Sequence, residues 1–460
     1  MLLRTLLWLL VLGALGACTP NKQLRTEFVD SNCLWGNTDC SSSVIERYLE
    51  YDLGFIEFTE RGNLYDRSIN ERVLNHIRRQ AKTPEGAAVF VFVHGWKHNA
   101  KFNDSNVVQF REFLSRAAEN EVVGKRKVIG LYLGWRGSVI EAPVLKETTY
   151  WGRKSVAQEV GAGGVTEVFA NLHQILVAQA DDQNQDLYKN SYVIIGHSFG
   201  GAIVLSALHD VLLKDIVAAN PSYSEIAHEC EKIRRFADAL ILLNPAIEAN
   251  KVVLLKEAAA RCKFDSTQAP LMHVLSSDGD SATRIFFPIG QYANIASPLS
   301  PKKLKRRVNG KDIILDERKL SINTIGNIEQ FRTAYLSFDR KTENWDMGLC
   351  VESLEDCRIT DSRQQANHFN VSEHDPLRFI KTGRTFIKDH NDAFGCYVQG
   401  FISSVVFETQ FIEKGFQTSK RRNLPAGCAD SSKDEFDFMQ CFNSQIEDYD
   451  CEPPTTLFGR

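Results

Sequence analysis

The stretch Tyr192-Val193-Ile194-Ile195-Gly196-His197-Ser198-Phe199-Gly200-Gly201 decides the fold of this 460-residue chain. Its apolar first part (192–195) predicts a strand, and the apolar run that follows the stretch (202–213) predicts a helix. A strand that breaks at Gly-x-Ser-x-Gly and passes directly into a helix is typical of a sharp turn that presents a serine hydroxyl at the helix N-terminus. Glycines suit its flanks, because a Cβ there would clash. We therefore predict that Ser198 is a catalytic nucleophile; the alternative is a purely structural turn.

Strands and helices are expected to alternate on both sides of this turn, which predicts an α/β fold with a mostly parallel, doubly wound sheet. Ala87–Val93 is a continuous apolar run, as in a strand buried on both faces. The other expected strands are 54–58, 128–133, 239–243, 271–275 and, as the last one, 384–388. The other expected helices are one opened by a capping box at Ser68, then 107–118, 166–179 and 246–261.

The regular alternation stops near residue 284, about a hundred residues before the last expected strand. We interpret residues 285–378 as a large insertion, beside the functional site, in a domain that spans 50–415. Residues 18–49 are polar and are expected to form a tether, and 416–460 form a Cys-rich acidic extension that we expect to be stapled to the body. The basic run from Lys302 to Arg307 is interpreted as a solvated loop, with a role at an anionic membrane surface as the alternative.

The N-terminus predicts export. Arg4 precedes a short apolar run (6–17) that is too brief for a membrane span, which needs about 20 apolar residues. The junction Leu15-Gly16-Ala17-Cys18 resembles the lipobox of bacterial lipoproteins, whose cysteine is acylated. This resemblance implies a signal peptide over 1–17, a lipid anchor at Cys18 and a place in the bacterial cell envelope. Thr19 after the cysteine implies the outer membrane, facing the periplasm. The alternative is an ordinary secretory signal in which Cys18 is incidental.

Removing Cys18 from the 11 cysteines leaves ten, an even number that suits disulfides in an oxidising compartment. Proximity suggests the pairs Cys33 with Cys40 and Cys350 with Cys357, and three more cysteines lie near the end, at 428, 441 and 451. A zinc site is the competing interpretation, but the chain has no Cys-x-x-Cys pair. The net charge of −4 gives no reason to expect a nucleic-acid partner.

A nucleophilic serine needs a histidine base, which comes last in the chain order Ser, acid, His. His390 is best placed among the histidines that follow Ser198, because it lies just past the last expected strand, in Lys388-Asp389-His390-Asn391-Asp392. A short loop there is expected to reach over the sheet edge. His374 is the second candidate, and a surface role is the alternative for His390.

The acid is expected just after the preceding strand, where the segment 276–283 contains Asp278 and Asp280. An aspartate beside glycine is often only a turn former, but here two lie where the architecture needs one. We favour Asp280. Asp278 remains open, as does Glu248, which follows the end of the expected strand 239–243.

An oxyanion hole needs two backbone N–H groups. We expect one from Phe199, directly after the serine, and one from Trp96, in the loop His94-Gly95-Trp96-Lys97-His98-Asn99 that follows the strand Ala87–Val93. The His-Gly pair resembles the oxyanion motif of lipases and esterases. A metal site at His94 and His98 is the alternative, but no carboxylate accompanies them in the loop. Trp135-Arg136-Gly137 either lines the site or caps a strand.

Together these pieces resemble the α/β-hydrolase superfamily, over roughly residues 50–283 and 376–410. Within it the chain is similar to a group of bacterial serine hydrolases of unsettled substrate. The shared-looking pieces are 53–58, 92–100, 133–137, 196–201 and 390–392. The group's acid precedes an Ala-Thr pair by two positions, which also favours Asp280.

The resemblance implies acyl transfer by Ser198, His390 and Asp280 without a metal or organic cofactor. We therefore expect a membrane-tethered esterase or lipase-like enzyme that acts on acyl esters or lipids. One alternative is a catalytically silent scaffold that acts as a binding module in the envelope. Another is an amidase or peptidase on the same triad, because fold alone does not fix the substrate.

Overall fold

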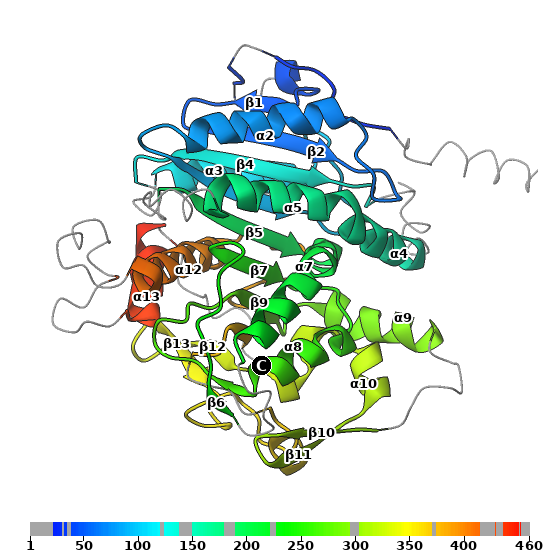
Figure 1. Ribbon diagram of the computed structural model, residues 1–460, viewed down its shortest axis with the longest axis vertical. Helices are drawn as coiled ribbons and strands as arrows, with labels where there is room; N and C mark the ends of the chain where they lie inside the picture. Colours follow the sequence, from blue (N-terminus) through cyan, green and yellow to red (C-terminus); the bar gives the residue numbers. More distant parts are fainter. Residues whose placement is uncertain are drawn as a thin grey trace, which may run out of the picture.

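The computed structural model describes residues 22–451, apart from 30–31, 35–37, 120–123, 138–149, 179–188, 221–226, 295–302, 370–373, 415–427, 429–435 and 450. A ten-stranded sheet lies at its centre (Figure 1). In spatial order the strands are β1 (Ile45–Arg47), β2 (Tyr51–Glu57), β4 (Lys127–Gly134), β3 (Ala87–Val93), β5 (Ser191–His197), β7 (Ala239–Leu243), β9 (Met272–Ser277), β14 (Leu377–Thr382), β12 (Ala334–Asp339) and β13 (Asn344–Leu349). Neighbours run parallel from β2 to β12, and the two outermost strands are antiparallel to theirs. The predicted α/β class with a mostly parallel sheet is therefore confirmed.

Helices cover both faces of the sheet. One face packs against α2 (Arg67–Ala81), α4 (Tyr150–Val160), α5 (Thr166–His173), α7 (Phe199–Ala218), α8 (Val253–Ala259) and the start of α9 (Phe287–Asn294). The opposite face packs against α3 (Ser105–Glu119), α12 (Cys396–Lys414) and α13 (Phe438–Asp448). The remaining elements are α10 (Glu317–Ile322), α11 (Ser362–Ala366) and two small sheets, β10 (Leu304–Val308) with β11 (Lys311–Leu315) and β6 (His228–Glu229) with β8 (Cys262–Lys263).

Strand β3 shows why the central strands are apolar throughout. All seven of its residues are buried. Val89 and Val91 belong to the core on one face of the sheet, whereas Phe90 and Phe92 belong to the core on the other. A strand covered on both faces has no polar side, so the alternation that marks a half-exposed strand is absent. The bounds predicted for this strand are confirmed.

The last strand in the described part of the chain is β14 (Leu377–Thr382), and the prediction of a strand at 384–388 is wrong. Strand β14 pairs in parallel with β9 on one side and β12 on the other, and the chain then turns at 384–386. The apolar residues that suggested a strand, Phe386 and Ile387, are each 1% exposed and pack from this turn into the core beneath α12. These two side chains are buried although their backbone pairs with no strand, which explains why their apolar pattern suggested one.

The insertion predicted at 285–378 extends the central sheet as well as adding surface elements. Its strands β12 and β13 continue the sheet beyond β14, so β14 lies inside the sheet instead of at its edge. The basic run, interpreted as a loop, forms strand β10 from Leu304 on. Lys305 pairs there with Asp312, and Arg306 pairs with Glu257. Lys302 lies outside the described residues.

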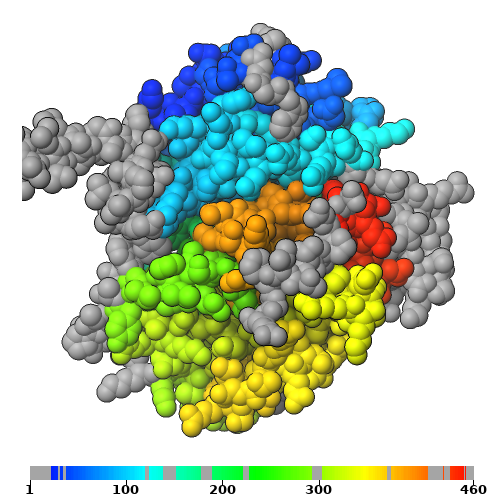
Figure 2. Space-filling model, turned by 180° about the vertical axis from the view of Figure 1, so that it is seen from behind, coloured from blue at the N-terminus to red at the C-terminus, as the bar shows by residue number. Residues whose placement is uncertain are grey.

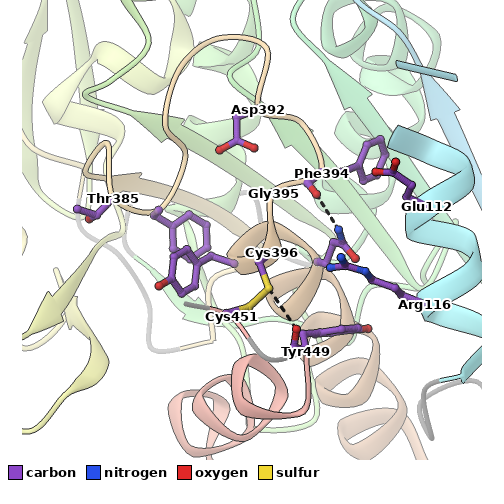
Figure 3. Close-up of a pocket in the computed structure, with 12 residues that line it drawn as sticks. Glu112, Arg116, Thr385, Asp392, Phe394, Gly395, Cys396, Tyr449 and Cys451 are labelled. Atoms are coloured by element: carbon purple, nitrogen blue, oxygen red, sulfur yellow. Dashed lines mark hydrogen bonds between the residues drawn. A yellow bond between two sulfur atoms is a disulfide. The ribbon is translucent and has the colours of Figure 1, made fainter. Parts of the chain in front are cut away.

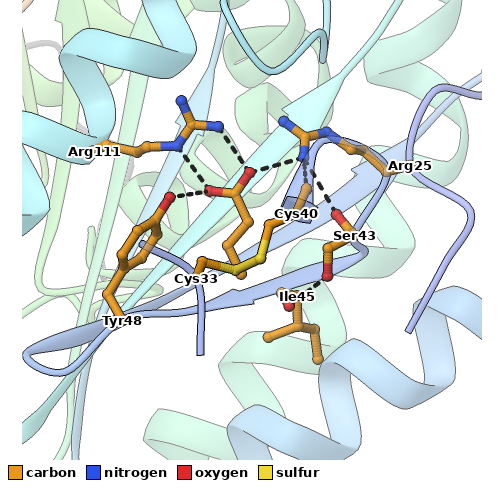
Figure 4. Close-up of a disulfide and its surroundings, with 8 residues drawn as sticks. Arg25, Cys33, Cys40, Ser43, Ile45, Tyr48 and Arg111 are labelled. Atoms are coloured by element: carbon orange, nitrogen blue, oxygen red, sulfur yellow. Dashed lines mark hydrogen bonds and ion pairs between the residues drawn. A yellow bond between two sulfur atoms is a disulfide. The ribbon is translucent and has the colours of Figure 1, made fainter. Parts of the chain in front are cut away.

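The described part of 18–49 is folded onto the body, which corrects the prediction of a tether. Strand β1 joins the sheet, and its Glu46 is fully buried. The Glu46 carboxylate accepts hydrogen bonds from Arg25 at 2.8 Å, from Arg111 at 2.7 Å and from the Tyr48 hydroxyl at 3.0 Å (Figure 4). A buried carboxylate without cations would be costly, and Arg25 together with Arg111 of α3 supplies the positive charge beside Glu46. Residues 1–21, including Cys18, lie outside the described residues.

All ten cysteines after Cys18 form disulfides. The pairs Cys33–Cys40 and Cys350–Cys357 were predicted from proximity. The others are Cys230–Cys262, Cys396–Cys451 and Cys428–Cys441. The bond from the start of α12 to residue 451 staples the described end of the C-terminal extension to the body, as expected. Figure 2 shows α13 beside α12 on this face.

Helix boundaries differ from the predictions where short polar or irregular turns intervene. Helix α2 is capped by Asp66 instead of Ser68, because the Asp66 carboxylate accepts the Ser68 backbone N–H at 2.8 Å. The helix expected at 166–179 is α5 followed by a π-helical turn at 174–178, with residue 179 outside the described part. The helix expected at 246–261 is a 3₁₀ turn at 249–252 followed by α8. In the described part of the chain, no helix is long and apolar enough to cross a bilayer.

Candidate active site

Ser198 occupies the sharp turn between β5 and α7. Its backbone has φ 56° and ψ −120°, a conformation that side-chain-bearing residues rarely adopt. The turn is possible because glycine flanks it. A Cβ on Gly200 would lie 1.9 Å from the Val93 carbonyl oxygen, and one on Gly196 would lie 2.8 Å from the Gly201 Cα. Ser198 thus lies at the carboxyl end of β5 and at the start of α7, where the sequence predicts it, and Gly200 packs closely against the end of β3.

His390 comes from the loop after β14 and meets the serine from the other side. Its Nε2 lies 2.8 Å from the Ser198 Oγ, within hydrogen-bonding distance. The two residues are 192 positions apart in the chain and meet because β5 and β14 both end at the same edge of the parallel sheet. This geometry lets the imidazole accept the serine proton.

Asp280 lies behind the histidine, in the loop after β9. Its Oδ1 is 3.0 Å from the His390 Nδ1, although the ring N–H does not point squarely at it. The Asp280 carboxylate is fully buried and also accepts the Thr283 backbone N–H at 3.1 Å and the Thr283 hydroxyl. Burial alone would raise the pKa of Asp280, but His390 and the Thr283 donors outweigh it and hold that pKa below its usual value. The carboxylate is therefore ionised at neutral pH.

The competing acids have other partners. Asp278 points to Lys381, whose Nζ is 3.1 Å from its carboxylate, and its side chain is 47% exposed. Glu248 forms an ion pair with Lys154 on α4. The second histidine candidate, His374, precedes β14 and so lies at the amino end of that strand, the opposite edge of the sheet from Ser198. The structure thus brings together the three residues favoured from the sequence.

The loop after β3 packs directly against the serine. A Cβ on Gly95 would lie 2.9 Å from the Ser198 Cβ, which leaves room only for glycine. Lys97 has a positive φ of 74°, and its N–H donates to the Gly137 carbonyl at 3.0 Å. Trp96 lies between these two fixed positions. Phe199 is the first residue of α7. Both residues predicted to supply oxyanion donors therefore lie next to Ser198 or next to a residue that contacts it.

Both ring nitrogens of His94 contact backbone groups. It is fully buried, its Nδ1 lies 2.9 Å from the Gly95 carbonyl oxygen, and its Nε2 accepts the Trp135 backbone N–H at 3.1 Å. Burial lowers the pKa of His94 to about 4, so the ring is neutral. His98 contacts Asp104 at 3.0 Å. The described residues contain no cluster of three or more His, Cys, Asp or Glu side chains that could hold a metal ion. Trp135 directly follows strand β4, and its backbone and indole N–H groups donate to His94, so it braces the loop after β3.

His197, immediately before the serine, is a functional candidate that the sequence analysis missed. Its Nε2 lies 2.6 Å from the backbone carbonyl oxygen of His390. Burial lowers the pKa of His197 to about 3, so the ring is neutral and can donate this hydrogen bond. The same loop is held by Ser277, whose hydroxyl donates to the Ile387 carbonyl at 2.7 Å. No local pattern marks such a contact, because the partners are nearly two hundred residues apart.

A polar pocket of about 430 Å³ borders the loop that carries His390 (Figure 3). It is lined by Glu112 and Arg116 of α3, by Asp392 and by Tyr449 next to the Cys396–Cys451 disulfide, among others. Ser198, Asp280 and His390 are not in its lining. The pocket is therefore distinct from the three-residue cluster.

Comparison with protein-family models, with curated proteins and with solved structures found no significant match for this chain.

Proposed function

We propose that this protein is a serine hydrolase of the α/β-hydrolase type that cleaves carboxylic esters. One observation carries the proposal: the contiguous chain of side chains from Ser198 Oγ through His390 to Asp280, with 2.8 Å and 3.0 Å between successive atoms. Ser198 follows β5, Asp280 follows β9 and His390 follows β14, which is the chain order Ser, acid, His. The positive φ of the serine and the glycines around it further support a nucleophile elbow.

In the proposed mechanism, the Ser198 oxygen attacks the ester carbonyl carbon while His390 Nε2 takes the serine proton. The amides of Phe199 and Trp96 stabilise the oxyanion of the tetrahedral intermediate. The intermediate collapses to an acyl-serine, and His390 returns the proton to the departing alcohol. Water then attacks the acyl-serine with the same histidine as base, which releases the carboxylic acid and restores the serine. Asp280, ionised in its buried site, orients the imidazole and stabilises its protonated form.

We further propose that the protein is a lipoprotein of the bacterial cell envelope, anchored through Cys18. Its five disulfides are compatible with an oxidising compartment. Replacing Cys18 by serine in the exporting host is expected to abolish metabolic labelling of the protein with palmitate. Undiminished labelling would contradict the anchor site.

The hydrolase proposal is tested by labelling the purified protein with a fluorophosphonate probe, which reacts with activated serines. Ser198→Ala and His390→Ala are expected to abolish labelling, whereas His374→Ala, the matched histidine control, keeps it. Loss of signal in the control as well would point to misfolding, so each variant is first checked by circular dichroism.

A folded wild-type protein that never reacts with the probe would refute the hydrolase and favour a silent scaffold that binds a partner. If the probe reacts, parallel assays with matched short-chain ester and amide substrates decide the reaction. Faster turnover of the ester is expected, and faster turnover of the amide would favour an amidase or peptidase.

A further inference from the structure

An unusual concentration of exposed apolar side chains lies on the helical segment after Asp280. This segment comprises a π-helical turn (Ala282–Phe286) and α9. Ile285, Phe286, Ile289 and Tyr292 are 44%, 66%, 64% and 56% exposed. They are four of the ten large apolar side chains that are exposed in the described part of the chain, and they fall within eight residues. We call these four residues the α9 apolar face. Contiguous exposed apolar surface on a folded protein usually marks an interaction site.

The segment is firmly seated by its other side, so the exposure does not reflect an undocked helix. Phe287 is 1% exposed and belongs to the core, and Thr283 donates two hydrogen bonds to Asp280. The Gln291 amide donates to Glu248 at 3.3 Å. These residues are spaced four apart and therefore share one face of the helix. The polar and core contacts are directed inward, and the α9 apolar face is directed outward.

The chain enters the fold at the same edge of the sheet. The backbone N–H groups of Leu24 and Arg25 donate to the carboxylate of Glu57, at 2.9 Å and 2.7 Å. Glu57 is the last residue of β2, so these amides lie at the carboxyl edge. The segment with the α9 apolar face leaves the same carboxyl edge after β9. Five strand spacings separate β2 from β9, which corresponds to about 24 Å.

The length of chain that precedes Arg25 limits where an anchor can lie. Cys18 is seven positions before Arg25 (25 − 18), and seven extended residues reach at most about 25 Å. A lipid at Cys18 would thus hold the carboxyl edge, with the α9 apolar face on it, close to the bilayer. The reach of the bilayer depends on the proposed anchor: if Cys18 carries a lipid, the bilayer that holds it is an apolar phase within reach of the face.

Two cationic side chains flank the face. Arg284 is exposed at the start of the segment, and the Arg318 guanidinium stacks over the Tyr292 ring at 4.8 Å. Arginine and tyrosine at the border of an apolar stripe suit the headgroup region, where their polar ends meet phosphate while the apolar side chains enter the acyl layer. We propose that the α9 apolar face docks on a lipid bilayer that carries anionic headgroups, independently of the reaction at Ser198. The bilayer would then contact the helical segment whose Thr283 donates hydrogen bonds to Asp280, the proposed triad acid.

The test uses a chain of residues 19–460, which keeps every described residue, with Ser198→Ala so that no lipid is consumed. Binding is measured by co-sedimentation with vesicles of phosphatidylethanolamine and phosphatidylglycerol. The double variant Phe286→Ser/Ile289→Ser is expected to bind at least about tenfold more weakly, because it removes the two most exposed apolar side chains of the face. The matched control is Leu254→Ser on α8, where an apolar side chain is 52% exposed outside the face; its binding is expected to be unchanged.

Absence of binding by the Ser198→Ala protein with an intact face, or equal binding by the double variant, would overturn the proposal. Sedimentation velocity without lipid tests the alternative occupant. If the protein with an intact face is a dimer and the double variant is a monomer, a second copy of the chain covers the face and the proposal is overturned. Since Ser198 is replaced throughout, these results do not depend on whether the protein is a hydrolase. Unchanged thermal unfolding of the double variant confirms that its fold is intact.

Discussion

Asp280→Asn is expected to lower the kcat for a short-chain ester by about 10⁴-fold. The substitution keeps the shape of the side chain, and its amide can still pair with the hydroxyl of Thr283, so the fold should persist. What disappears is the negative charge 3.0 Å from His390 Nδ1. With an effective dielectric constant of about 20, a charge pair at this distance is worth about 5.5 kcal/mol, which corresponds to about 10⁴ in rate. The same magnitude is typical of this substitution in Ser-His-Asp triads.

The matched control is Asp278→Asn, two positions away. Asp278 contacts Lys381 and is half exposed, so its replacement is expected to change kcat by less than about tenfold. Both variants are compared by steady-state hydrolysis of a p-nitrophenyl ester, after their thermal unfolding has been shown to match the wild type. A loss below about tenfold for Asp280→Asn, or an equal loss for Asp278→Asn, would refute the assignment of the acid.

Three further predictions concern stability. Glu46→Gln leaves two buried guanidinium groups without their carboxylate and should lower the free energy of unfolding in urea by about 3–5 kcal/mol. The control Glu159→Gln removes an exposed ion pair and should lower it by less than about 1 kcal/mol, so equal effects of the two variants would contradict the buried network. Replacing Cys396 and Cys451 together by alanine opens a 55-residue loop and should cost about 4 kcal/mol in the same assay, and no loss would show that the bond is dispensable. Stability should fall as the pH falls from about 6.5 to about 4, because buried histidines stay neutral in the native state while the unfolded chain binds protons, at up to about 1.4 kcal/mol per pH unit for each. These histidines are His94, His197, His273 and His368. Burial raises the pKa of Glu57 to about 7, so Glu57 binds a proton in the native state over this pH range and offsets the destabilising effect of one histidine. The other histidines still lower the stability, so an unchanged free energy of unfolding in urea at pH 7, 6 and 5 would contradict the prediction.

The sequence predicted the arrangement of Ser198, Asp280 and His390 because each follows a strand of one parallel sheet. The carboxyl ends of parallel strands meet at one edge, so an apolar run followed by a chemically capable residue locates that residue in space. His390 was placed correctly in this sense although the strand before it was misplaced by several residues. The error was harmless because the true strand β14 ends only eight residues before the histidine.

What the sequence could not predict depends on long-range pairing. Strands β12 and β13 carry no signal that they join the main sheet beyond β14, since their partners lie far along the chain. The polar composition of 18–49 suggested a tether. The burial of Arg25 could not be predicted, because it depends on the carboxylate of Glu46 in β1 and on Arg111 in α3, which meet only in the folded chain. His197 looked like a variable position of the motif, and only the folded chain brings its ring to the His390 carbonyl.

The position of β14 between β9 and β12 has a consequence for biosynthesis. Both neighbours are synthesised before β14, so the sheet retains a gap until the last strand is threaded between them. Pairings between distant segments form late because loop closure must precede them. The serine and the aspartate precede this step in the chain, whereas His390 follows it. Under the proposed function, a nascent or stalled chain that ends before residue 377 would therefore hold an unreactive serine, and the reactivity of Ser198 would report that the protein has finished folding.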